Sequence, residues 1–211
     1  MPTNLATVCG PLSAVLAVER VLLNFLQRLC GVATLTRAYV DAVAGTGAAI
    51  FDTRKTTPGW RALEKYAVRC GGGSNHRMGL DDAVLLKDNH LVGIEPRRLA
   101  DSVFEMLNRL SARDAKPTFL EIEADCLEQV EQLLKVVGID AILLDNFSVD
   151  QLGKAVALRD RVGLRGKVSL EASGRITLQT VRVVAETGVD RISVGALTHS
   201  ATALDLSLDR V

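Results

Sequence analysis

The chain has 211 residues, of which 48% are hydrophobic, and its 25 basic residues balance its 25 acidic residues. This length and apolar content are sufficient for one α/β domain with a substantial core. Because the charges balance, no global field is available to hold a nucleic acid or an anionic membrane, and any anion must be recognised by a local cluster.

The first strongly apolar stretch is LSAVLAVERVLLNFL, which Glu19 and Arg20 interrupt. These charges argue against a signal peptide or a membrane span. Apolar residues at helical spacing predict a helix from Leu12 to about Leu29, which Gly31 ends, and a second helix over 34–43.

Short apolar runs then alternate with amphipathic stretches. The runs predict strands in AAIFD (48–52), AVLLKD (83–88), TFLEIEA (118–124), AILLD (141–145), KVSLEA (167–172) and RISVG (191–195). The stretches predict helices over 60–70, about 96–110, 127–138, 149–160 and 176–188. Such alternation is typical of parallel strands joined by right-handed crossover helices.

Two architectures fit this alternation, an open doubly wound sheet and a barrel. The residues at the ends of the strands distinguish between them. Almost every strand ends on an ionisable or glycine-flanked position. An open sheet places its ligand at one switch point, whereas a barrel brings all strand ends to one mouth. Since fewer than eight strands are visible, we predict an incomplete TIM-like α/β barrel over 46–211, preceded by a helical segment at 1–45.

Two segments carry a cluster of cations. Arg54 and Lys55 directly follow the first strand, and His76, Arg77 and Lys87 lie in NHRMGLDDAVLLKDNH. A solvated basic loop would explain the first pair alone. A lysine that ends a core strand, however, must meet a carboxylate or an anion, and arginine suits bidentate carboxylate recognition. Together the five residues predict a pocket for several negative charges.

The four cysteines at positions 9, 30, 70 and 126 form no CxxC pair and share no ligand spacing with the histidines. We therefore expect reduced, mostly buried thiols and a cytoplasmic protein.

The string from Asp52 to His90 resembles the signature region of quinolinate phosphoribosyltransferase, and EIEAD, LLDNF, LEASG and ISVGALTHSATALDLSL resemble that family in the same order. The resemblance implies transfer of a phosphoribosyl group from phosphoribosyl pyrophosphate to the ring nitrogen of quinolinate, followed by decarboxylation to nicotinate mononucleotide. It implies an incomplete barrel with a separate N-terminal domain, of which we expect this chain to carry only the helix bearing Arg20.

The resemblance also implies roles for particular residues. Thr53 and the five cations would bind the dicarboxylate and phosphate groups, and Arg20 matches an arginine that the family inserts into the active site of a neighbouring subunit, so we expect a homodimer or a higher homo-oligomer. Lys55, Lys87, Glu123 and Asp145 are the expected catalytic residues.

The acidic strand ends are assigned to the sugar donor. Glu123 and Asp145 could bind the ribose hydroxyls and Mg²⁺, directly or through the substrate, or stabilise positive charge at the anomeric carbon. They could also simply pair with nearby lysines and arginines. Glu121 is expected on the opposite face of the strand, so Glu123 is the stronger candidate.

The loops after the last two strands are predicted to bind phosphate through backbone amides. The residues concerned are Ser173, Gly174, Arg175, Val194, Gly195, Ala196 and His199. Arg175 departs from the family pattern, which favours a small or amide side chain, and could add a phosphate contact or crowd the pocket. His90 is predicted to support the loop of Lys87.

Two further functions stay open at this point. The chain could be a non-catalytic remnant that binds phosphoribosyl pyrophosphate or a partner chain. It could also be a related phosphoribosyltransferase-like protein that acts on another substrate, although five cations suit a dicarboxylate better.

Overall fold

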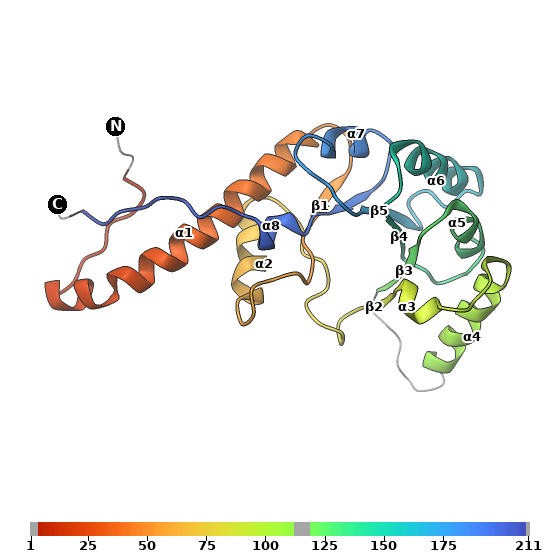
Figure 1. Ribbon diagram of the computed structural model, residues 1–211, viewed down its shortest axis with the longest axis horizontal. Coiled ribbons are helices and arrows are strands. Elements are labelled where there is room, and N and C mark those ends of the chain that lie inside the picture. Colours follow the sequence, from red (N-terminus) through yellow and green to blue (C-terminus); the bar gives the residue numbers. More distant parts are fainter. Residues whose placement is uncertain (1–3, 112–118, 210–211) are drawn as a thin grey trace.

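The computed structural model of the protein describes residues 4–111 and 119–209 and contains a sheet of six parallel strands (Figure 1). Thr118, at the start of the third predicted strand, lies outside this range. The strands are β1 (Ala49–Phe51), β2 (Val84–Leu86), β3 (Leu120–Ala124), β4 (Ala141–Asp145), β5 (Ser169–Ser173) and β6 (Arg191–Ser193). Their order across the sheet is β1-β6-β5-β4-β3-β2. Because β1 and β2 end the sheet and are not paired with each other, the barrel is incomplete, as predicted.

Helices follow the strands along the chain and cover the outer side of the sheet (Figure 1). They are α1 (Leu12–Ala42), α2 (Arg61–Cys70), α3 (Asp88–Leu91), the 3₁₀ helix η1 (Pro96–Arg98), α4 (Leu99–Ser111), α5 (Leu127–Leu133), α6 (Val149–Arg161), α7 (Val181–Ala185) and α8 (Ala196–His199). The five helices predicted between strands are therefore confirmed, with η1 leading into α4.

The two faces of the sheet differ in chemistry because successive side chains alternate between them. Ile122, Ile142 and Leu170 are in register on neighbouring strands, are fully buried and belong to the core under the helices. The residues between them include Glu121 and Glu171, which are also fully buried. The barrel thus has an apolar outer layer and an ionisable interior.

The long helix α1 differs from the sequence prediction, which had two helices separated at Gly31. The structure has one helix of 31 residues. A Cβ atom at Gly31 would lie 2.1 Å from the backbone oxygen of Thr202, in the C-terminal segment that runs beside α1. The backbone N–H of Leu204 donates to Gln27 O at 3.0 Å in the same region. Gly31 therefore permits close packing, which outweighs the helix cost of glycine, roughly 1 kcal/mol.

The two halves of α1 have different surroundings. Val32 and Tyr39 are buried in the core, whereas Leu12, Leu16 and Val21, each 59% exposed, lie on the half that projects from the barrel (Figure 1). The division into 1–45 and 46–211 stays a prediction. Among the described residues, no helix has the length and apolarity that crossing a membrane requires.

The expectation that the cysteines are mostly buried is wrong. Cys9 and Cys70 are exposed, and Cys30 and Cys126 are half-buried, all four as free thiols. Cys70 is the last residue of α2, and Cys126 directly precedes α5. At these helix ends a short side chain does not reach the core.

Candidate active site

A cavity of about 620 Å³ opens where the strands end. It is lined by all the predicted site residues except Arg20: Thr53, Arg54, Lys55, His76, Arg77, Lys87, Glu123, Asp145, Ser173, Gly174, Arg175, Val194, Gly195, Ala196 and His199. Residues up to 146 positions apart in sequence thus meet because parallel strands present their carboxyl ends at one mouth. The individual roles of these side chains stay predictions.

The loop that carries Arg54 and Lys55 is held by a buried carboxylate on α2. Glu64, fully buried, accepts from the backbone N–H of Thr57 at 3.0 Å and from its hydroxyl at 2.9 Å. Thr198 fixes the other side, since its hydroxyl donates to Lys55 O at 2.8 Å. Protein contacts on both sides therefore position the loop.

The loop that carries His76 and Arg77 is held by a second buried ion pair. Lys65, which follows Glu64 on α2, pairs with Asp52 just after β1 and donates to His76 O at 2.9 Å. Asp52 accepts from the backbone N–H of His76 at 2.8 Å and from Asn75 Nδ2 at 2.6 Å. Two consecutive residues of α2 thus anchor the two cationic loops.

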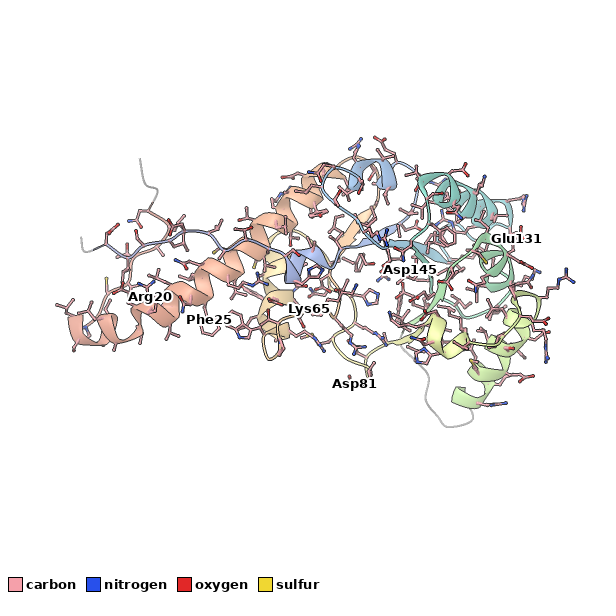
Figure 2. All side chains as sticks on the ribbon, in the orientation of Figure 1. Arg20, Phe25, Lys65, Asp81, Glu131 and Asp145 are labelled. Carbon is pink, nitrogen blue, oxygen red and sulfur yellow. The ribbon has the colours of Figure 1, made fainter. Side chains whose placement is uncertain are left out.

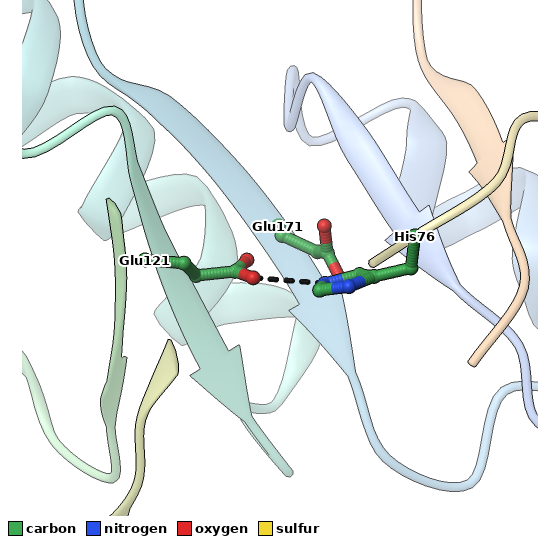
Figure 3. A group of neighbouring side chains, drawn as sticks. All are labelled: His76, Glu121 and Glu171. Atoms are coloured by element: carbon green, nitrogen blue, oxygen red, sulfur yellow. Dashed lines mark ion pairs between the residues drawn. The ribbon is translucent and has the colours of Figure 1, made fainter. Parts of the chain in front are cut away.

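His76 reaches into the barrel, where it meets two carboxylates (Figure 3). Its Nε2 lies 2.8 Å from Glu121 Oε2 and 3.5 Å from Glu171 Oε1. Burial lowers the pKa of His76, but the two neighbouring carboxylates outweigh burial and raise this pKa to about 9. Arg191 completes the cluster, with its Nε 2.7 Å from Glu171 Oε2.

This geometry corrects the placement of Glu121, which we had expected on the opposite face of β3 from Glu123. Both side chains point into the barrel, because residues i and i+2 of a strand lie on the same face. Burial and the nearby Glu171 raise the pKa of Glu121. The pKa of Glu171 is lowered: its own burial opposes ionisation, but His76 and Arg191 stabilise the ionised form.

The wall formed by β2, β3 and β4 is acidic. Lys87, whose side chain is half exposed, has its Nζ 3.6 Å from Glu123 Oε2. Burial raises the pKa of Glu123; Lys87 opposes this shift, whereas Asp145 and Asp125 add to it. Burial and Asp145 likewise raise the pKa of Asp125. One carboxylate oxygen from each of Glu123, Asp125 and Asp145 can lie within 4.8 Å of the others. Oxygen ligands that repel one another suit a hard cation such as Mg²⁺.

The glycine-rich loops close the opposite side of the cavity. A Cβ atom at Gly195 would lie 3.1 Å from His199 Nε2 and 3.2 Å from Lys55 Cδ, so glycine lets these two side chains approach. Arg175 adopts a left-handed backbone with φ of 51° and is exposed at the cavity. The prediction for His90 is confirmed, since its Nδ1 accepts from the backbone N–H of Lys87 at 2.9 Å.

Arg20 is the one predicted site residue that the cavity does not include. It is exposed on the projecting half of α1, well away from Asp145 at the cavity (Figure 2). Its predicted role therefore requires a second chain.

Sequence reasoning missed several residues that shape the site, namely Asp52, Glu64, Lys65, Glu171 and Arg191 as buried supports. Glu64 and Lys65 left a readable signal, because they share a helix face with the buried Ala67 and Val68. A charge on the apolar face of a helix needs a buried partner. The partners come from helix α1 and from the loops on either side of α2, and could not be identified from spacing.

Known proteins are similar to this chain in sequence and in fold. Residues 32–209 match the family model described as quinolinate phosphoribosyl transferase, C-terminal domain. A nicotinate-nucleotide pyrophosphorylase [carboxylating] from Mycobacterium leprae is 47% identical over 97% of this chain and 69% of that protein. A probable enzyme of the same name from Bacillus subtilis is 42% identical over 97% of this chain and 67% of that protein.

Solved structures agree with the sequence relatives. The crystal structure of NadC from Streptococcus pyogenes has a TM-score of 0.83 and 40% identity, over 95% of this chain and 66% of that chain. The chain thus spans about two thirds of the length of the relatives it matches. On the strength of the family model and of these relatives, the chain belongs to the quinolinate phosphoribosyl transferase family.

Proposed function

We propose that this chain catalyses the reaction after which its relatives are named. It would transfer the phosphoribosyl group of phosphoribosyl pyrophosphate to the ring nitrogen of quinolinate and release pyrophosphate, CO₂ and nicotinate mononucleotide. The observation that carries the proposal is a cavity at the strand ends that both cationic and acidic side chains line. A dicarboxylate suits the cations, and a sugar that develops positive charge suits the acids.

The cationic side would bind and orient quinolinate. Arg54, Arg77 and Lys87 line the cavity from three separate segments of the chain, so they can neutralise two carboxylates on one ring. Burial lowers the pKa of Arg77, and the nearby Arg54 adds to this shift. An anion bound beside the two guanidinium groups would oppose both effects. A fixed dicarboxylate directs the ring nitrogen towards the donor sugar, and such orientation lowers the barrier to transfer.

The acidic side would act on the sugar donor. Glu123 and Asp145 could bind the ribose hydroxyls and stabilise oxocarbenium character as pyrophosphate leaves. Backbone amides of the loops at Ser173 and Gly195 would hold phosphate oxygens. The carboxylates of Glu123, Asp125 and Asp145 would hold Mg²⁺, which supplies charge neutralisation of the leaving pyrophosphate when bound.

Decarboxylation needs no further protein group in this scheme. After transfer, the ring nitrogen carries a positive charge. The carbon–carboxylate bond beside it breaks, its electron pair stays on the ring carbon, and that carbon then takes up a proton. The cationic ring nitrogen stabilises the electron pair while CO₂ leaves.

The decisive experiment measures nicotinate mononucleotide formation with phosphoribosyl pyrophosphate and Mg²⁺, using quinolinate or nicotinate as acceptor. We expect turnover of quinolinate alone. Lys87→Ala and Arg77→Ala should each lower kcat/KM by roughly 100-fold, whereas Glu131→Gln on the exposed surface of α5 should leave it unchanged (Figure 2). Wild-type activity and quinolinate affinity in both cationic variants would refute the assignment. Binding of the donor without turnover of either acceptor would favour a non-catalytic role.

We further propose that the active form is at least a homodimer in the cytoplasm. The projecting half of α1 exposes Leu12, Leu16 and Val21, and apolar surface of this kind favours association. In such a dimer, Arg20 of one copy would enter the cavity of the other. Sedimentation analysis of the full chain tests this, and a monomer at assay concentration would contradict it.

A further inference from the structure

An ionisable cluster lies inside the barrel, and two of its members, His76 and Glu171, also line the cavity of the proposed quinolinate site. It consists of His76, Glu121, Glu171 and Arg191, and we call it the interior cluster (Figure 3 shows the first three). Both glutamates are fully buried. Burying two carboxylates costs free energy unless charged or hydrogen-bonding partners stabilise them.

Both ring nitrogens of His76 have protein partners. Nε2 lies 2.8 Å from Glu121 Oε2, and Nδ1 accepts from the backbone N–H of Arg77 at 2.8 Å. The ring therefore cannot donate to a substrate without giving up one of these contacts. This differs from the sequence prediction, which placed His76 among the substrate ligands.

The contact at Nδ1 connects the barrel interior to the anion site. Arg77 lines the cavity, and its Nη1 donates to Ala83 O at 3.0 Å. Its backbone is held by the His76 ring, and the ring is held by Glu121. The chain of contacts thus runs from a buried strand carboxylate to a cavity guanidinium in two steps.

The rest of the interior cluster keeps Glu171 ionised and in place. Arg191 pairs with Glu171 and lies over two aromatic rings, with its guanidinium carbon 4.0 Å from the Phe51 ring centre and 4.9 Å from that of Phe119. The positive charge of Arg191 makes a bound cation among His76, Glu121 and Glu171 unfavourable, although these three could offer ligand atoms. Their close contacts fit a shared proton better.

We propose that Glu121 is a positioning residue of the anion site, which acts through His76 on Arg77. The inference rests on the proposed function for the identity of the anion, a dicarboxylate. Glu121 anchors the His76 ring through Nε2 and thereby fixes the ring beside the backbone N–H of Arg77. Other charged groups surround His76. Glu171 from β5 lies near its ring, and Arg191 from β6 pairs with Glu171. Lys65 from α2 and Asp52 after β1 contact its backbone.

The sign of one binding measurement separates this role from simple electrostatics. Glu121→Gln removes a negative charge beneath an anion site, so a purely electrostatic role predicts tighter binding of a dicarboxylate. The positioning role predicts weaker binding, because the His76 ring loses its anchor. Phthalate, a dicarboxylate without the ring nitrogen, is a suitable probe for calorimetry. We expect roughly ten-fold weaker phthalate binding by Glu121→Gln and unchanged binding by Glu131→Gln.

Histidine NMR provides a readout that does not require activity. The chain has three histidines, so the ring signals of His76 can be assigned by single substitution. We expect no titration of His76 between pH 6 and 8 in the wild type and a new titration step in that window in Glu121→Gln. The double variant His76→Gln/Glu121→Gln should bind phthalate no more weakly than His76→Gln alone.

The outcomes distinguish this inference from the proposed function. A wild-type His76 that titrates between pH 6 and 8, or phthalate affinity in Glu121→Gln equal to that of Glu131→Gln, would overturn the inference even if the enzyme is active. Weaker phthalate binding by Glu121→Gln in a protein that makes no nicotinate mononucleotide would support the inference and refute the proposed function. The absence of any phthalate binding by the wild type would refute both.

Discussion

The substitution Glu64→Gln is expected to weaken the contacts that hold the loop of Arg54 in place. Glu64 Oε1 lies 2.9 Å from Arg28 Nη2 and accepts the Thr57 hydroxyl, while Oε2 accepts the Thr57 N–H. Glutamine keeps the volume but replaces one oxygen by an NH₂ group, which can only donate. In one orientation this group faces the Thr57 N–H, and in the other it faces Arg28, so one donor is left without an acceptor.

The magnitude follows from burial. Glu64 is fully buried, and the side chain of Arg28 is 23% exposed. An unsatisfied buried donor costs about 1–3 kcal/mol, and breaking a buried ion pair costs about 3–5 kcal/mol. Because Arg28 keeps contacts with Thr198 O and Ala201 O, we expect a loss near the lower bound of the ion-pair range, about 3 kcal/mol in the free energy of unfolding.

Urea unfolding followed by circular dichroism measures this loss, with Glu131→Gln as the matched control that should change stability by less than about 0.5 kcal/mol. The double-mutant cycle of Glu64→Gln with Arg28→Met should give a coupling energy of at least about 1 kcal/mol. A loss below about 1 kcal/mol for Glu64→Gln would refute the reasoning, because it would mean that the loop finds other acceptors.

Three more outcomes are expected. Gly31→Ala should lower the free energy of unfolding by about 1–3 kcal/mol, since its Cβ would overlap the backbone of Thr202; an unchanged urea midpoint would show that the C-terminal segment can move aside freely. In a mixture of Arg20→Ala and Lys87→Ala chains, activity should partly recover, because a mixed dimer contains one cavity with both native residues; no recovery would contradict the shared site. Finally, the pKa of His76 is raised from 6.5 to about 9, so its contribution to the free energy of unfolding is complete below about pH 6.5 and is lost as the pH rises to 9. Stability measured by urea unfolding should therefore fall between pH 7 and 9, and less so in His76→Gln; equal slopes for the two proteins would count against the cluster.

Much of the fold could be predicted because its signals are local. Strand runs such as AILLD and amphipathic stretches such as VDQLGKAVALRD have periods that depend only on neighbouring residues. The cationic motif could be located for the same reason, since Arg54 and Lys87 each lie within three residues of the end of a strand. Position at a strand end implies a place at the mouth of a barrel without any knowledge of distances.

One error arises from contact between distant parts of the chain. Gly31 was interpreted as the end of a helix, but the backbone at Thr202 requires a residue without a side chain there. The role of His76 as a substrate ligand stays a prediction, but the carboxylates that strands β3 and β5 supply to its ring could not be foreseen from spacing. The error at Glu121 is different, because the two-residue period of a strand would have placed it correctly.

The sequence alone determined the alternation of elements, the family and the set of polar residues at the strand ends, since these depend on local periodicity and on motif order. Only the tertiary structure decided how those residues are supported. Glu64 and Lys65, adjacent on one helix, hold two different loops because the helix packs between them. Arg20 lies outside the cavity because α1 projects from the barrel. Such facts depend on which segments meet in space, and a linear pattern does not contain this information.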